Sequence, residues 1–120
     1  MTDTGSDAER ARVEARFRQS VNMSADELEE WLRTRESRAV GWKGRDGKQA
    51  ESIGHASGRR IVSILRTEKQ DLTESNYAHM RKVTGFVRRH LAQQPDNVVT
   101  SRWRYSLMNW GHDPLKSIGH

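Results

Sequence analysis

The sequence predicts an all-α fold, a small bundle of four to five helices that includes a helix-loop-helix element. Apolar residues recur with the 3.6-residue period of a helix in several segments of the chain. A serine or threonine stands before most of these segments, where a helix N-cap is expected. The length of 120 residues allows one core and is too short for two ordinary domains.

The composition is polar but typical of a folded protein, with 33% hydrophobic and 31% charged residues. The absence of cysteine excludes disulfides, thiolate metal sites and cysteine nucleophiles, and it fits a reducing compartment. The first residues lack the basic and apolar regions of a signal peptide, and no run of about 18 apolar residues is present. We therefore expect a soluble, cytoplasmic protein that has no membrane partner.

The first predicted helix begins at a capping box, Ser6-Asp7-Ala8-Glu9, and runs to about residue 19. Its apolar side is weak and consists of Ala8, Ala11, Ala15 and Phe17. We expect residues 1–19 to form a helical extension whose first turns are partly disordered. Residues 20–115 are expected to form a single α-helical domain, and residues 116–120 a tail.

The second helix is predicted over residues 24–35. A second capping box, Ser24-Ala25-Asp26-Glu27, is followed by Leu28, Trp31 and Leu32 at i, i+3 and i+4. The pattern then breaks over residues 36–49, where three glycines alternate with Trp42 and basic residues. This segment is predicted to be a basic loop.

Three further elements complete the bundle. A helix is predicted to begin between residues 49 and 57, with residues 59–67 as its firm part, because apolar residues there follow the helical period. The longest apolar stripe follows Thr73 and predicts a helix over residues 74–93 that stops before Pro95. Ser101 is predicted to cap a short last helix that Gly111 ends.

The segment Gly54-His55-Ala56-Ser57-Gly58-Arg59-Arg60 leads into the helix whose firm part is predicted over residues 59–67. If the helix starts here, its free N–H groups, the glycines and the two arginines form a site suited to phosphate. If the helix already covers both glycines, their spacing of four residues permits close backbone packing instead. The sequence leaves both interpretations open.

Charge is distributed unevenly along the chain. Residues 1–36 hold six Lys and Arg against nine Asp and Glu, a balance of −3, whereas residues 37–120 hold fifteen against seven, a balance of +8. Such an asymmetry favours a partner with phosphates that contacts the middle and C-terminal parts of the chain. A generally basic surface without a specific partner is the alternative.

Residues 24–67 resemble the SAP motif of DNA-binding proteins. The resemblance is carried by an acidic, leucine-bearing first helix and by a glycine-plus-basic opening of the second, namely Glu27-Leu28-Glu29-Glu30-Trp31-Leu32 and Ser57-Gly58-Arg59-Arg60-Ile61-Val62-Ser63-Ile64-Leu65. It implies that this element binds DNA.

Most of the chain is also similar to an uncharacterised family of small proteins of unknown function, whose members are often labelled DNA-binding proteins. The segments that carry this similarity are Asn22-Met23-Ser24, Glu27-Leu28-Glu29-Glu30-Trp31-Leu32, Gly54-His55-Ala56-Ser57-Gly58-Arg59-Arg60-Ile61, Tyr77-Ala78-His79-Met80-Arg81-Lys82-Val83, Arg89-His90-Leu91-Ala92-Gln93 and Ser106-Leu107-Met108-Asn109-Trp110-Gly111-His112-Asp113-Pro114. The similarity implies DNA binding and no catalytic residues.

We therefore predict a DNA-binding protein that contacts mainly phosphates of double-stranded DNA, without sequence preference, and is associated with the nucleoid. The residues assigned to nucleic-acid binding are Lys43, Arg45, Lys48, Ser57, Gly58, Arg59, Arg60, Arg81, Lys82, Arg88 and Arg89, with Arg102 and Arg104 as an extension. Trp42 either stacks on a base or covers a small core. The other large aromatic residues are assigned to the core, namely Trp31, Tyr77, Phe86, Trp103 and Trp110.

The sequence offers less support for other classes of function. A metal or acid-base site would need His55, His79, His90 and His112 to converge, but no HExxH pattern or close pair supports it, so structural roles are expected. No P-loop, dinucleotide fingerprint or recognisable triad is present, and we expect no enzyme activity, cofactor or metal. The alternative to DNA binding is a protein-protein interaction module that offers the acidic residues Asp26, Glu27, Glu29 and Glu30 to a basic partner.

Overall fold

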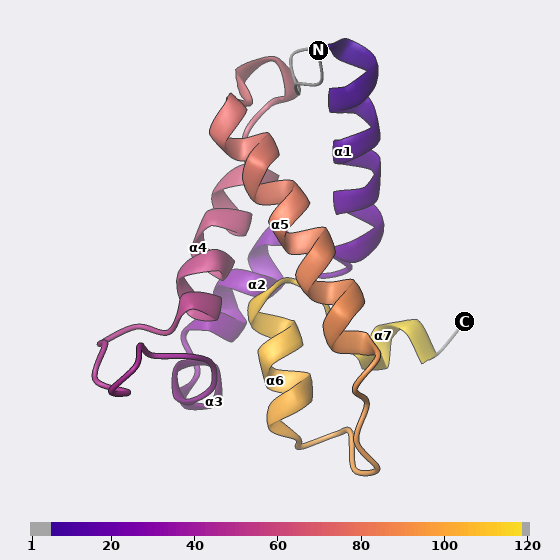
Figure 1. Ribbon diagram of the computed structural model, residues 1–120. Helices are drawn as coiled ribbons and strands as arrows, with labels where there is room; N and C mark the ends of the chain where they lie inside the picture. The colour runs from indigo at the N-terminus through magenta and orange to yellow at the C-terminus, as the bar shows by residue number, and fades with distance from the viewer. Residues whose placement is uncertain (1–5, 119–120) are drawn as a thin grey trace.

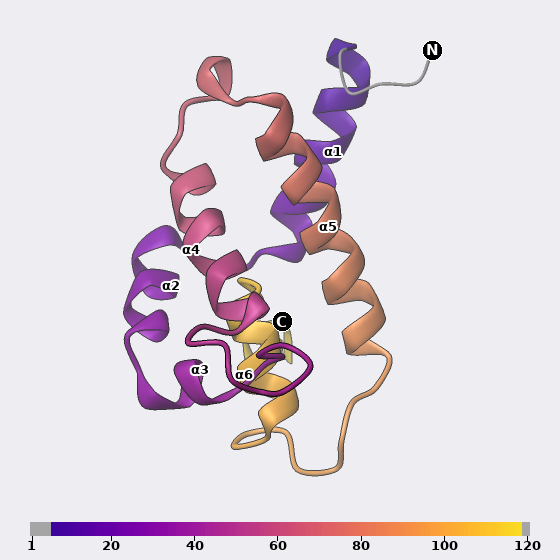
Figure 2. The same cartoon turned by 60° about the vertical axis from the view of Figure 1, so that its left-hand side comes forward.

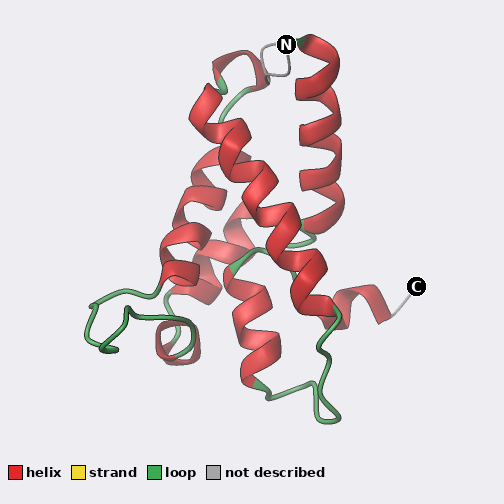
Figure 3. Cartoon of the chain, viewed as in Figure 1, coloured by secondary structure: helices red, strands yellow, loops and turns green. Residues whose placement is uncertain are grey.

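Helices and connecting loops make up residues 6–118, the part of the chain that the computed structural model describes (Figures 1 and 3). The α-helices are α1 (Asp7–Ser20), α2 (Ala25–Leu32), α3 (Arg35–Ala39), α4 (Ile53–Leu65), α5 (Glu74–Leu91), α6 (Arg102–Asn109) and α7 (Pro114–Ile118), and a 3-10 turn, η1 (Lys69–Asp71), joins α4 to α5. The predicted all-α bundle is confirmed. None of the described helices is long and apolar enough to cross a membrane.

Side-chain caps start the helices where the sequence predicts them. Ser6, Ser24, Thr73 and Ser101 each accept a hydrogen bond from the backbone N–H three residues further on. In α2 and α5 the capping box is complete, because the third residue of the helix also bonds back to the N–H of the cap.

The long helix α5 organises the bundle. It packs along α1 on one side, and α4 lies between α5 and α2 (Figure 2). The short helix α6 reaches α2, α3, α4 and α5. The fully buried side chains at their centre include Phe17, Leu28, Ile61, Met80 and Leu107. All the aromatic residues assigned to the core belong to or pack against this cluster, as predicted.

The helix predicted over residues 24–35 ends at Leu32, and a second short helix, α3, occupies the start of the segment that was predicted to be a loop over residues 36–49. Thr34 separates them, because its hydroxyl donates to the carbonyl of Trp31 at the end of α2 and accepts from the N–H of Ser37 at the start of α3. The turn directs the fully buried Ser37 to Asn109 of α6, whose side chain also accepts from the indole N–H of Trp31. A buried polar node therefore ties α2 and α3 to α6.

The two ends of the chain are more closely tied to the core than the sequence indicates. Val13 and Phe17 of α1 are part of the single core, so α1 is one wall of the bundle. Helix α7 begins at Pro114 and runs into the segment predicted to be a tail, where Lys116 donates to the carbonyl of Asn22 and pairs with Glu27. Residues 1–5 and 119–120 lie outside the described part.

Helix α4 begins at Ile53, within the predicted interval, and ends at Leu65, two residues before the predicted end. It therefore covers both Gly54 and Gly58, and the packing interpretation of the two glycines is confirmed. A Cβ added at Gly58 would lie 2.6 Å from the carbonyl oxygen of Asn109 and 2.7 Å from a methyl of Leu32. Only a glycine permits this approach of α4 to α6.

Candidate nucleic-acid interface

The residues assigned to nucleic-acid binding fall into three groups, apart from Arg60 and the three loop cations, and the first group faces the interior. Ser57 and Gly58 are buried within α4, and the Ser57 hydroxyl lies 2.9 Å from Nε2 of His79. The N-cap of α4 is Ser52, which accepts from the N–H of His55. The expectation that Ser57 and Gly58 open the helix toward a phosphate is wrong, because they lie one turn inside it.

The second group, Arg59, is neutralised by its own chain. Its guanidinium donates to both oxygens of Glu51, at 2.7 and 2.6 Å. These bonds and a further one from His55 lower the pKa of Glu51 to about 2, although burial acts in the opposite direction. A guanidinium held by two charge-assisted bonds is a poor phosphate ligand, since binding would require breaking them.

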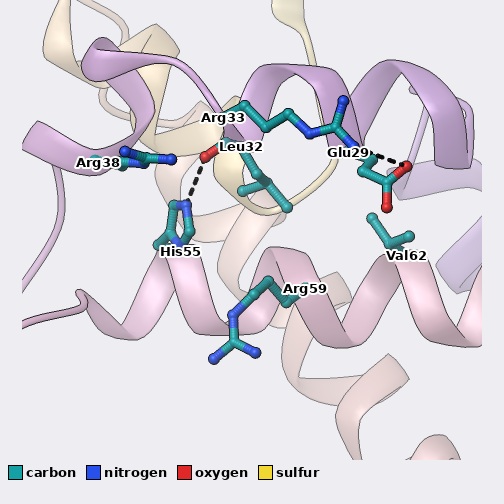
Figure 4. A pocket seen from close by; sticks show the side chains of 7 residues that line it. All are labelled: Glu29, Leu32, Arg33, Arg38, His55, Arg59 and Val62. Atoms are coloured by element: carbon teal, nitrogen blue, oxygen red, sulfur yellow. Dashed lines mark hydrogen bonds and ion pairs between the residues drawn. The ribbon is translucent and has the colours of Figure 1, made fainter.

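A groove between α2 and α4 lies beside this network, and its arginines are also mostly paired with carboxylates of the same chain (Figure 4). Arg33 extends along α2 and pairs with Glu29, and Nε2 of His55 lies 2.7 Å from the carbonyl oxygen of Leu32. Of the three arginines that line this groove, Arg38 alone has no ion pair within residues 6–118. The groove is therefore nearly balanced in charge.

The third group lies on the outer face of α5 and is both exposed and unpaired. Arg81, Lys82, Arg88 and Arg89 are all exposed, and none forms an ion pair with a carboxylate within the described residues. Their positions i, i+1, i+7 and i+8 place them on one side of the helix. Ala78 and Gly85 lie between them on this side. We call these four cations with Ala78 and Gly85 the α5 basic strip.

The α5 basic strip continues into a second groove, between α1 and α5. Its cavity of about 190 Å³ is lined by Arg12, Arg16, Arg81 and Arg88, with Glu9 as its one carboxylate, and Glu9 pairs with Arg12. The hydroxyl of Thr84 in this lining is buried and has no hydrogen-bond partner among the described residues. Arg16 was not predicted to contribute to the interface, because its partner helix is far away in sequence.

Arg60 of α4 adds a further cation beside the start of α5. Arg60 is exposed and donates to the hydroxyl of Ser75 at the start of α5, at 2.9 Å. It lies close enough to His79, as Lys82 does, to help lower the pKa of that imidazole. The adjacent arginines of α4 thus diverge, since Arg59 points to Glu51 and Arg60 to α5.

The basic loop is ordered by its own backbone. The N–H of Ile53 donates to the carbonyl of Trp42, and that of Gln49 to Lys43, both at 3.0 Å. Gly41 starts the loop with a φ of 102°, where a Cβ would lie 2.9 Å from the side chain of Ser52. Within this loop Arg45 and Lys48 are exposed and Lys43 is half-buried. None of the three has an ion pair within the described residues.

The two arginines expected to extend the surface have structural partners. Arg104 donates to both oxygens of Asp113 and to the carbonyl of Val99. Arg102 lies within hydrogen-bond distance of the carbonyl of Ala39, at 3.4 Å. Both link α6 to neighbouring segments.

Beside the loop a third groove combines aromatic and basic residues. Its cavity of about 360 Å³ is lined by Trp42, Ile53, Lys82, Phe86, Arg89, His90 and Trp110, together with Gly41, Gly54, Ser106 and Asn109. We call it the Trp42 groove. Trp42 is 57% exposed, so it does not cover the core. No carboxylate belongs to this lining.

The floor of the Trp42 groove belongs to a column of aromatic rings from α5 and α6. Trp110 stacks on Phe86 with centroids 4.3 Å apart, and Phe86 stacks on His90 at 4.9 Å. His79 and Trp103 lie at the two ends, 6.2 Å from Trp110 and 6.1 Å from His90. The signal that marks this column in the sequence is the shared helical face of residues 79, 86 and 90, and sequence reasoning missed it.

The histidines have separate roles. His55 lies in the network with Glu51, His79 faces Ser57, His90 stacks in the column, and Nδ1 of His112 lies 2.7 Å from the carbonyl of Ser20. Within residues 6–118 no three His, Asp or Glu side chains gather as a metal site. The arrangement gives no convergent acid-base centre.

The acidic residues of α2 are largely neutralised within the chain. Arg66 pairs with Asp26 and Glu29, and Lys116 pairs with Glu27. These bonds lower the pKa values of Glu27 and Glu29. Glu30 is exposed and has no ion pair within the described residues, so the α2 face keeps part of the negative charge that the sequence indicates.

Comparison with known proteins adds a family assignment. No curated protein and no solved structure matches the chain. A family model described as a protein of unknown function, DUF3140, matches residues 16–108, which span α2 to α6 almost completely and the last five residues of α1. This match agrees with the expected membership of an uncharacterised family, and the chain belongs to the DUF3140 family.

Proposed function

We propose that the protein binds DNA through phosphate contacts made by the α5 basic strip. The observation that carries the proposal is that Arg81, Lys82, Arg88 and Arg89 are exposed on one side of one helix without a carboxylate partner in the described chain. Surface cations of a small protein usually lie near opposite charges, as Arg59 and Arg66 do here. An uncompensated strip is suited to a polyanion.

The geometry of the strip fits a duplex. Arg81 and Arg88 are two turns apart, which places them about 10 Å from each other along the helix axis. The major groove of B-DNA is about 12 Å wide and admits a helix, so cations on both flanks of α5 can reach phosphates on both strands. Ala78 and Gly85 are the smallest side chains available, and they let the backbone approach the duplex surface.

Neighbouring cations extend the same face. Arg60 lies beside the start of α5, and Arg16 lies across the α1–α5 groove from Arg81 and Arg88. The loop that carries Lys43, Arg45 and Lys48 meets α5 through Gly41 and Trp42, which line one groove with Lys82 and Arg89. Ser57, Gly58 and Arg59 are not part of the proposed interface, because the first two are buried and the third is bound to Glu51.

Phosphate contacts of this kind supply affinity without sequence choice. Two neighbours of the strip support the proposal, namely Arg60 of α4 beside Ser75 and Trp42 of the basic loop in the groove with Lys82 and Arg89. The alternative of a protein-interaction module relies on the acidic face of α2. That face is occupied by Arg66 and Lys116, which favours DNA binding over the alternative.

The proposal is tested with two charge-matched double variants, Arg81→Gln/Arg88→Gln and Arg33→Gln/Arg66→Gln. Both remove two exposed arginines, but the second pair already has carboxylate partners. Binding of a labelled random-sequence duplex is measured by fluorescence anisotropy after circular dichroism has shown that both variants fold. The first variant should weaken binding strongly at low salt, and the second should weaken it little. Equal losses in both would show that only net charge matters and would contradict an interface on α5.

A further inference from the structure

We propose that the Trp42 groove holds a single unstacked nucleobase, so that the protein prefers single-stranded or locally unpaired nucleic acid over a perfect duplex. This inference rests on the proposed function, because it adds a base contact to the phosphate contacts of the α5 basic strip. It names the class of nucleic acid that the same surface would take.

Two large apolar side chains are exposed at the mouth of the groove. Trp42 is 57% exposed and Ile53 is 44% exposed, and both line the same cavity of about 360 Å³. This volume lies within the range of small-ligand pockets, about 300–1,000 Å³. Adjacent exposed apolar side chains are costly in water and mark a contact surface.

The backbone around Trp42 holds this residue in place. The carbonyl of Trp42 accepts from the N–H of Ile53, the first residue of α4, and the positive φ of Gly41 sets the direction in which the loop leaves the bundle. The indole is therefore displayed by a fixed backbone and is not the tip of a free loop. A pre-positioned ring loses little entropy when a second ring stacks on it.

The groups that line the groove match those of a nucleotide. The groove joins an aromatic wall to two cations, Lys82 and Arg89, and no carboxylate lines it. A nucleotide has the matching parts, which are a planar ring to stack and a phosphate to pair. Its lining also holds His90, whose buried Nε2 lacks a hydrogen-bond partner among the described residues. This nitrogen is closed to solvent, so the contact with a base rests on stacking against the exposed indole of Trp42 and on the two cations.

The Trp42 groove is continuous with the proposed interface. Lys82 and Arg89 belong both to the Trp42 groove and to the α5 basic strip. A strand whose phosphates lie along α5 therefore passes the groove mouth, and a base without a partner can turn into it. A fully paired duplex keeps its bases stacked and gains nothing from Trp42, because extruding a base costs a few kcal/mol.

The experiment compares three labelled oligonucleotides of one sequence: a 30-mer single strand, its perfect duplex, and the duplex with one extrahelical base. Binding is measured by anisotropy for the wild type, Trp42→Ala, Trp42→Phe and Val99→Ala. Val99 is 54% exposed and lies outside the groove lining, so its variant controls for loss of an exposed apolar side chain. All four proteins are first compared by thermal unfolding.

We expect Trp42→Ala to weaken binding of the single strand and of the bulged duplex by roughly 5- to 150-fold, the loss typical of one stacked base. Binding of the perfect duplex should change less than about two-fold. Trp42→Phe should restore most of the affinity because it keeps a stacking face, and Val99→Ala should behave as the wild type. Quenching of tryptophan fluorescence by the single strand should be lost in Trp42→Phe.

Two results would overturn the inference in different ways. In the first, the affinity of the wild type for the duplex falls steeply with salt concentration, but Trp42→Ala leaves all three affinities unchanged. The groove then serves another class of partner, and the phosphate proposal stands. If the wild type binds none of the three oligonucleotides at low salt, both the inference and the proposed function fail.

Discussion

Gly58 and Gly85 lie in the interiors of α4 and α5, and the space around them predicts opposite effects of the same substitution. A Cβ at Gly58 would meet a backbone carbonyl at 2.6 Å, which cannot move without shifting α6. A Cβ at Gly85 would meet only the mobile end of Arg89, at 2.9 Å. Gly58→Ala should therefore lower the free energy of unfolding by about 1–3 kcal/mol.

Gly85→Ala should raise that free energy by up to about 1 kcal/mol, because alanine is the better helix former and the arginine can swing away. Urea unfolding followed by circular dichroism measures both values. A neutral Gly58→Ala would show that the packing of α4 on α6 is looser than described, and a destabilised Gly85→Ala would show that Arg89 cannot move away from the new methyl group.

His79 predicts a dependence of stability on pH. Burial, with a smaller contribution from Arg60, lowers the pKa of its imidazole from 6.5 to about 4. Between these values the unfolded chain binds a proton that the folded protein does not, so stability decreases as the pH falls. The loss amounts to at most about 3 kcal/mol over this window.

The measurement is the free energy of unfolding between pH 7 and pH 4 for the wild type and for His79→Gln. Glutamine can still bond to Ser57 but does not titrate, so the variant should lose much less stability over the same interval. Glu51, with its pKa lowered from 4.5 to about 2, begins to add a loss near pH 4.5, and His90, whose pKa burial also lowers, adds one in both proteins alike, so the difference between the two curves reports His79. Parallel curves for the two proteins would rule out His79 as the cause.

Single residues are also where sequence reasoning reached its limit. Arg59 and Arg60 are adjacent and chemically identical, yet one is bound to Glu51 and the other is open to solvent beside α5. Asn109 is fully buried because Trp31 and Ser37, far away in sequence, converge on it. Such roles depend on tertiary contacts, and no local pattern reports them.

At the scale of elements, α1 provides the clearest test of how the bundle is assembled. The helix looks polar in sequence, but its fully buried Phe17 lies in the core, and Arg10 covers the ring of Tyr77 at 5.1 Å. Phe17→Ala should cost about 3–5 kcal/mol of stability, the usual loss for a buried phenylalanine. Gln19→Ala, an exposed position on the same helix, should change stability by less than about 0.5 kcal/mol.

Thermal and urea unfolding of these two variants and the wild type measure the difference. A similar, small effect of both would mean that α1 is an extension beside the domain, as the sequence indicates, and not a wall of its core.

Helix starts were predictable because capping is local. Ser24, Thr73 and Ser101 mark their helices in sequence and cap them in the structure. The break between α2 and α3 was not predictable, because Thr34 has to turn the chain so that Ser37 can reach α6. Helix α7 was missed for the same reason, since Lys116 is held by Glu27 and Asn22, near the opposite end of the chain.

At the scale of the whole molecule, the fold brings charged residues from distant parts of the chain together as ion pairs. The acidic surplus of residues 1–36 is partly cancelled by Arg66 and Lys116 from the basic part of the chain. What remains uncompensated in the described structure lies mainly along α5 and the basic loop. The sequence predicted these cations as a set, but only the fold separates them from the paired ones and places Trp42 beside them.

The most direct test of the account is the slope of log K against log salt for binding to a random-sequence duplex. The wild type is compared with a variant that carries glutamine at all four cationic positions of the α5 basic strip. We expect a steep negative slope for the wild type and a slope shallower by about 3 to 4 for the variant, because each phosphate contact contributes about 0.9. An unchanged slope, or no binding by the wild type at low salt, would contradict the assignment of α5 as the DNA-binding element.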